Sequence, residues 1–84
     1  RMEELAFRPV ETRLAAFLLE RGEREPGRAL ALTHQEIAIE LGSAREVVSR
    51  HLKLMEKAGL VALGRSSLQV RDPVGLMRLR DGSR

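Results

Sequence analysis

Two helix-start patterns on either side of a glycine constrain this chain more than any other feature. The segments Thr33-His-Gln-Glu36 and Ser43-Ala-Arg-Glu46 both have the form of a capping box, in which a Ser or Thr and a Glu three residues later cap each other's backbone N–H groups. Gly42 directly precedes the second segment, and glycine suits the left-handed end of a helix. The sequence therefore predicts two short helices joined by a tight turn, the second over 43–58.

The spacing of three residues sharpens this prediction. Ala38 is small enough for the second helix to cross closely over the first, and Gly42 permits a left-handed backbone at the turn. Val48 then supplies the apolar side chain that locks the pair, with Ile37 and Leu41 as apolar neighbours. This arrangement is typical of a helix-turn-helix.

The flanking segments complete a small domain. A helix is predicted from Pro9 to about residue 21, with Gly22 as its stop, and a short strand over 29–32. Apolar runs at 60–63 and 68–70 around a turn predict a hairpin. Asp72 and Pro73 then begin a last helix that carries Val74, Leu76, Met77 and Leu79. The predicted fold class is mainly α with a small β-hairpin, a winged helix-turn-helix.

Composition fits one small domain with an aliphatic core. The chain has 84 residues, two Phe and neither Trp nor Tyr, so Leu, Val, Ile and Ala must form the core. The formal charge of +3 comes mostly from Arg and is compatible with nucleic-acid binding, although a GC-rich coding sequence would also enrich Arg. With no Cys, no membrane-length apolar run and nothing resembling a signal peptide, we expect a cytoplasmic protein.

The second helix divides into two faces at about 100° per residue. One face is predicted to point inward and comprises Val47, Val48, His51, Leu52, Leu54, Met55 and Ala58. The other face is polar and comprises Arg45, Glu46, Ser49, Arg50, Lys53, Glu56 and Lys57. A polar helix face is often only a solvated surface, but its position after the turn and before a hairpin favours docking in the major groove of DNA.

The stretch over 32–61 resembles the signature of the CRP/FNR family of bacterial regulators, with the segment Arg45-Glu-Val-Val-Ser-Arg50 at its core. The resemblance implies that Arg45, Glu46, Ser49 and Arg50 read the bases of a TGTGA-type half-site. The chemistry agrees, since Arg donates two hydrogen bonds to guanine and Glu accepts from the cytosine amino group.

The same resemblance implies a set of phosphate contacts. The residues concerned are Thr33, His34, Gln35, Ser43, Lys53 and Arg65. Thr33 is also a helix cap, and an exposed turn residue is the alternative for Arg65. His51 departs from the aliphatic residue usual in the family and is interpreted as a half-buried boundary residue.

The resemblance also sets expectations for organisation and partners. Residues 1–8 are expected to be the tail of a preceding dimerisation helix, and 9–84 the DNA-binding domain. The partners expected are double-stranded DNA, a second copy in the full-length protein, and RNA polymerase through the loop over 23–28, for which an inert loop is the alternative. The effector domain of the family is missing, so no cofactor and no metal are expected in this domain.

Other classes remain open to different degrees. A winged helix of the MarR or GntR type would keep DNA binding with another operator, and a protein-binding winged helix would not need Arg45 and Arg50. Catalysis is disfavoured because His34 and His51 lie on different helices and the chain has neither Cys nor a Gly-rich phosphate loop.

Overall fold

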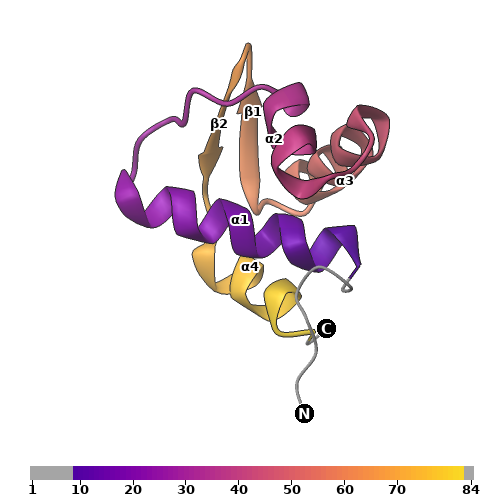
Figure 1. Cartoon of the computed structure of the whole chain (residues 1–84). Helices are drawn as coiled ribbons and strands as arrows, with labels where there is room; N and C mark the ends of the chain where they lie inside the picture. Colours follow the sequence, from indigo (N-terminus) through magenta and orange to yellow (C-terminus); the bar gives the residue numbers. More distant parts are fainter. Residues whose placement is uncertain (1–8, 83–84) are drawn as a thin grey trace.

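The computed structural model describes residues 9–82 and contains four helices and one hairpin (Figure 1). The elements are α1 (Val10–Arg24), α2 (His34–Leu41), α3 (Arg45–Lys57), β1 (Val61–Gly64), β2 (Ser67–Val70) and α4 (Pro73–Arg80). Helix α1 crosses the middle of the molecule, with α4 on one side and the hairpin, α2 and α3 on the other. The predicted winged helix-turn-helix is confirmed, while the expectation for residues 1–8 lies outside the described residues.

The core lies where α1 meets the other elements, and it is aliphatic as the composition predicts. Its buried apolar side chains are Leu14, Ala15, Leu18, Leu19, Leu30, Leu32, Ile37, Ala38, Val48, Leu52, Met55, Val61, Leu68 and Leu76. Every helix and strand contributes at least one of them, so the polar faces of the helices are held in fixed positions by shared packing.

Helix α1 does not stop at Gly22, as the sequence predicted, but continues to Arg24. Gly22 serves instead as a close-approach point, since a Cβ added to it would lie 3.2 Å from Cγ2 of Val70 in β2. A stop glycine adopts a left-handed backbone, and Gly22 keeps the helical one.

The capping box of α2 is confirmed. The Thr33 side chain accepts a hydrogen bond from the Glu36 backbone, and the Glu36 carboxylate accepts one from the Thr33 backbone. At its other end, Gly42 has φ 65° and α2 closes with a Schellman motif, in which Ser43 N–H donates to the Ala38 carbonyl at 2.9 Å. The glycine turn is therefore built as predicted.

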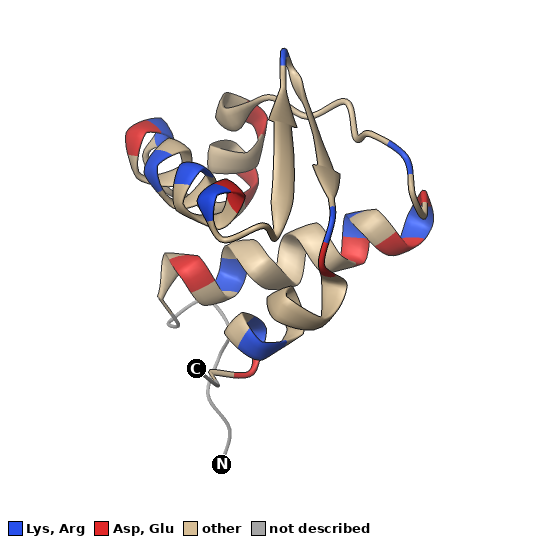
Figure 2. Cartoon of the chain, turned by 180° about the vertical axis from the view of Figure 1, so that it is seen from behind, with Lys and Arg blue, Asp and Glu red and all other residues tan. Residues whose placement is uncertain are grey.

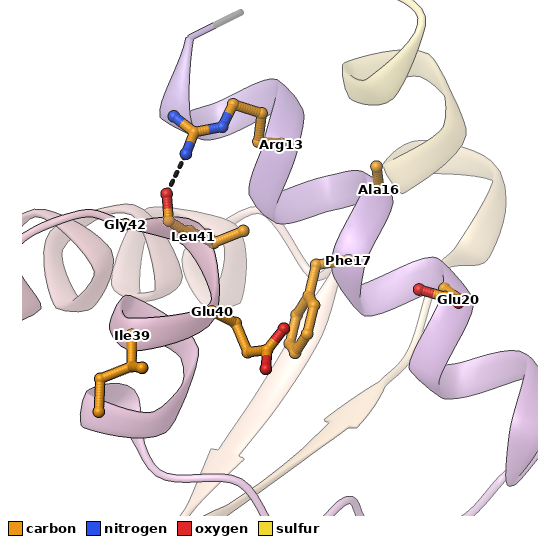
Figure 3. Close-up of a pocket in the computed structure, with 8 residues that line it drawn as sticks. All are labelled: Arg13, Ala16, Phe17, Glu20, Ile39, Glu40, Leu41 and Gly42. Atoms are coloured by element: carbon orange, nitrogen blue, oxygen red, sulfur yellow. Dashed lines mark hydrogen bonds between the residues drawn. The ribbon is translucent and has the colours of Figure 1, made fainter. Parts of the chain in front are cut away.

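Arg13 of α1 fastens this end of α2 to the rest of the domain. Its guanidinium donates to the carbonyl oxygen of Leu41, one of the last carbonyls of the helix (Figure 3). The contact borders a hollow between α1 and α2 that is lined by Ala16 and Phe17 of α1 and by Glu40 of α2 (Figure 3). Terminal carbonyls lack intrahelical partners, so this contact satisfies one of them while fixing the turn against α1.

The second capping box, predicted at Ser43, is wrong. The N-cap of α3 is Ala44, whose side chain makes no capping hydrogen bond. The backbone N–H of Ser43, which a capping box would give to Glu46, is donated instead to the Ala38 carbonyl in the Schellman motif of α2. Helix α3 therefore starts at Arg45 rather than at residue 43 and ends at Lys57, before Gly59 with φ 80°.

The inward face of α3 is narrower than the predicted one. Val48, Leu52 and Met55 are buried, whereas Leu54, predicted to point inward, is 58% exposed. Ala58 is exposed as well, while Val47 and His51 are intermediate. The buried positions follow the i, i+4, i+7 stripe expected of a helix that packs along one line.

The hairpin is antiparallel, with Val61 opposite Val70 and Gly64 opposite Ser67. Arg65 and Ser66 form the turn, where Ser66 has φ 54°. The short strand predicted over 29–32 is reduced to a single bridge between Leu30 and Leu68.

Helix α4 begins as predicted, with Pro73 in its first turn and the Asp72 carboxylate accepting from Gly75 N–H at 3.0 Å. Leu76 is fully buried and Leu79 packs against the core. Of the four apolar residues predicted for this helix, the other two are exposed, Val74 by 54% and Met77 by 39%.

Candidate nucleic-acid interface

The polar face of α3 gathers the residues predicted to read bases. Arg45, Glu46, Ser49 and Arg50 line one open depression, together with Lys53. All except the half-buried Ser49 are exposed. Figure 2 shows the Lys and Arg positions spread along α3, with acidic positions between them. The structure thus brings together on one surface every side chain that the sequence assigned to base reading.

Local packing explains why this face points outward. Val48, Leu52 and Met55 anchor α3 from behind, and the exposed polar residues occupy the remaining arc of the helix. The Schellman motif at Gly42 fixes where α3 starts, three residues after the glycine. The core packing of α3 therefore fixes the backbone positions from which these side chains project.

One hydrogen bond crosses between the two helices at this surface. Nδ1 of His34, the first residue of α2, lies 2.7 Å from Oγ of Ser49 on α3. Burial lowers the pKa of His34 below its usual value of 6.5, and the positive charges of Arg45 and Lys53 lower it further. His34 therefore belongs to the same electrostatic cluster as the α3 residues.

The predicted phosphate contacts are less closely grouped. The capping box engages the backbone N–H groups of Thr33 and Glu36, which leaves those of His34 and Gln35 without helical acceptors. Ser43 is half-buried in the turn between the helices. Lys53 lies in the α3 depression, whereas Arg65 is exposed on the separate hairpin turn and does not line it.

Sequence reasoning missed the residue that links α3 to the hairpin. The Glu56 carboxylate accepts a hydrogen bond from the backbone N–H of Leu63 in β1 at 3.0 Å. The sequence placed Glu56 on the polar face without a role. A side chain-to-backbone bond across the Gly59 turn depends on where the strand lands, and no local pattern signals it.

The described residues offer little for other chemistry. Over 9–82, no three His, Asp or Glu side chains come together in a way that could hold a metal ion. Within the same range, none of the helices has the length and apolar character needed to span a membrane.

Comparison with known proteins identifies the family to which this domain belongs. The family described as the Crp-like helix-turn-helix domain matches residues 12–79. Two curated relatives come from Thermus thermophilus: transcriptional regulator SdrP is 34% identical over 96% of this chain and 43% of its own length, and cyclic AMP receptor protein is 31% identical over 96% and 38%. The chain thus spans about two fifths of their length. A solved CRP/FNR-family regulator from Eubacterium rectale superposes with a TM-score of 0.82 at 37% identity, covering 89% of this chain and 35% of its own.

Proposed function

Because this chain belongs to the Crp-like helix-turn-helix domain family of transcription regulators, we propose that α3 enters the DNA major groove and reads a pseudo-palindromic, TGTGA-like operator. The observation that carries this proposal is the shared depression on α3. Two exposed arginines, an exposed glutamate and the half-buried Ser49 line it on one packed helix, with Lys53 beside them.

The chemistry of these side chains matches base edges in the major groove. Arg45 and Arg50 each donate two hydrogen bonds to the N7 and O6 atoms of a guanine. Glu46 accepts from the N4 amino group of a cytosine, and Ser49 contacts a neighbouring base. All four residues lie in the first two turns of α3, the part of a recognition helix that reaches the bases.

The phosphate contacts then set the register. The N-terminus of α2 directs the N–H groups of His34 and Gln35 toward one phosphate, with Thr33 and Ser43 at its sides. Lys53 and Arg65 contact the backbone farther along, Arg65 from the turn of the hairpin. These contacts add affinity without discriminating between sequences.

The working unit in this proposal is a dimer. Two copies occupy half-sites about 34 Å apart, one turn of DNA. In this proposal 9–84 is the DNA-binding domain, and any effector site belongs to a further domain. Two roles are open for the loop over 23–28, contact with RNA polymerase and an inert connection. Charge reversal at Glu23 and Glu25, assayed by transcription from a dependent promoter, distinguishes them.

Fluorescence-anisotropy titration of the chain against a duplex with two inverted TGTGA half-sites tests the proposal. A shuffled duplex and several salt concentrations run alongside, because the phosphate contribution depends on salt. We expect tighter binding to the palindrome. The Arg45→Ala variant should lose about 1–3 kcal/mol and its discrimination at one base pair.

Arg78→Ala is the matched control, since Arg78 is an exposed arginine of α4, on the other side of α1 from α3. It should bind like the unchanged chain. Full discrimination by Arg45→Ala would show that the base assignment is wrong. Equal binding to both duplexes would support DNA binding but contradict the TGTGA-like operator. No binding to either duplex at low salt would favour a protein-binding winged helix.

A further inference from the structure

We propose that His34 determines the hydrogen-bonding polarity of the Ser49 hydroxyl, and thereby which bases α3 selects at the position that Ser49 faces. This inference rests on the proposed function, since it requires α3 in the major groove. It assigns His34 a role in sequence discrimination, beyond a phosphate contact. His34 is a positioning residue in this proposal, because it acts on the base through Ser49.

The geometry limits what Ser49 can offer to a base. Its Oγ lies 2.7 Å from Nδ1 of His34, and both side chains are half-buried at the junction of α2 and α3. A serine hydroxyl has one hydrogen and two lone pairs. The hydrogen or lone pair that points to His34 is occupied by that contact. The imidazole therefore decides whether Ser49 presents a donor or an acceptor to the groove.

A neutral His34 makes Ser49 an acceptor. In the proposed complex, Nε2–H of the ring donates to a phosphate, which leaves Nδ1 with a lone pair. The Ser49 hydrogen then points to Nδ1, and only lone pairs of Oγ face the DNA. Lone pairs select amino groups, so adenine N6 or cytosine N4 is the favoured partner.

Protonation of His34 reverses this preference. The imidazolium takes one proton from solvent and then has N–H donors at both ring nitrogens. Its Nδ1–H donates to Oγ, and the hydroxyl hydrogen is released toward the groove. Ser49 then acts as a donor and favours acceptors, such as thymine O4 or guanine O6 and N7.

Burial and two nearby positive charges both favour the neutral form of His34 in the free protein. Arg45 and Lys53, both on α3, act on the ring with the same sign as burial and lower its pKa. On α2 itself, the nearby Glu36 carboxylate is engaged by Thr33 N–H. Phosphates that neutralise the two cations would weaken their effect, so the DNA-bound protein should take up the proton at a higher pH than the free protein.

A panel of operators tests the inference with the 84-residue chain. Each position of the half-site carries all four base pairs in turn, and anisotropy is measured at about pH 8 and about pH 5.5, on either side of the usual histidine range. The position that Ser49 faces is the one where Ser49→Ala removes discrimination. There, the unchanged chain should favour amino-bearing bases about threefold to tenfold at the higher pH, and lose or reverse that preference at the lower.

Two His34 variants separate polarity from mere structure. His34→Gln cannot titrate, so its base preference should not change with pH. His34→Arg has only donors, so it should favour guanine or thymine at both pH values. Circular dichroism melting of each variant confirms folding before binding is compared.

The outcomes distinguish the two proposals. If both His34 variants keep the preference and pH dependence of the unchanged chain while Ser49→Ala abolishes discrimination, Ser49 reads a base but His34 does not control it. If Ser49→Ala changes no position of the panel, Ser49 reads no base and the inference is overturned, while the arginine contacts stand. If the unchanged chain binds no duplex, the proposed function itself fails.

Discussion

The carboxylate of Glu56 and the backbone N–H of Leu63 form a 3.0 Å hydrogen bond that joins α3 to the outer edge of β1. Leu63 pairs with Leu68, whose own N–H and C=O bond outward to Leu30 at 3.0 and 2.6 Å. The two edges of the hairpin are thus occupied at the same level, one by α3 and the other by the segment before α2. These bonds join the hairpin to α3 at one edge and to the segment before α2 at the other.

If Glu56 fixes the hairpin, its loss should disturb the contribution of Arg65 to DNA binding. Arg65→Ala should weaken binding to all sequences alike and lower the salt slope by about 1. Glu56→Ala should remove part of the same contribution. The double variant should therefore lose less DNA-binding free energy than the two single variants together, with a coupling energy of about 0.5 kcal/mol or more. Glu56→Gln keeps an acceptor oxygen and is the control. Strictly additive losses in the salt-dependent titration would show that the hairpin needs no support from Glu56.

The caps of α2 and α3 predict opposite results for two similar substitutions. Thr33→Ala removes the capping side chain of α2 and should lower the free energy of unfolding by about 1 kcal/mol. Ser43→Ala should change it little, because Ser43 contributes through its backbone. Urea unfolding followed by circular dichroism compares them. A larger loss for Ser43→Ala would contradict the assignment of Ala44 as N-cap.

The left-handed turn at Gly42 gives a second stability prediction. An added Cβ would meet no atom within 4 Å, but φ 65° strains any residue with a side chain. Gly42→Ala should therefore cost about 1–2 kcal/mol through backbone strain. Gly42→Asn should cost less, since Asn tolerates this conformation. Thermal melting of both variants is the measurement, and equal melting temperatures for Ala and Gly would exclude a strained turn.

Leu52 and Leu54 form a matched pair on α3. Leu52 is fully buried, so Leu52→Ala should destabilise the domain by about 2–5 kcal/mol. Leu54 is 58% exposed, and Leu54→Ala should lie within about 0.5 kcal/mol of the unchanged chain. Comparable losses at both positions in denaturant unfolding would mean that Leu54 is covered in solution.

The lowered pKa of His34 predicts how stability changes with pH. The unfolded chain binds a proton near pH 6.5, whereas the folded chain binds it only at a lower pH. Folding is therefore favoured by this residue above pH 6.5, and the contribution is lost as the pH falls from 6.5 toward the lowered pKa. Unfolding curves measured over this pH range should show a smaller decline in the free energy of unfolding for His34→Gln than for the unchanged chain. An unchanged pH profile in this variant would assign the decline to other groups.

The features predicted correctly from the sequence are those decided by neighbours along the chain. Thr33 and Glu36 are three residues apart, and their mutual capping depends on nothing else in the fold. Asp72 and Pro73 start α4 for the same reason. Gly42 ends α2 through its own left-handed backbone conformation, which needs no contact with another part of the chain.

The errors arise where another part of the chain decides. Gly22 resembles a helix stop, but it lies inside α1. The absence of a side chain there lets Val70 of β2 approach the helix closely. Ser43 matches a cap, yet the end of α2 already engages its backbone. The bond between His34 and Ser49 joins residues 15 apart and depends on how the two helices cross, which no spacing along one helix specifies.

Helix α1 has a mechanical consequence for this domain. Near its start, Arg13 holds the end of α2, and near its finish, Gly22 touches β2, while α4 packs along it. A displacement of α1 would therefore move α2, α3 and the hairpin together. The shared core thus makes α1 the element through which an applied rotation reaches the polar face of α3 and the hairpin turn at once.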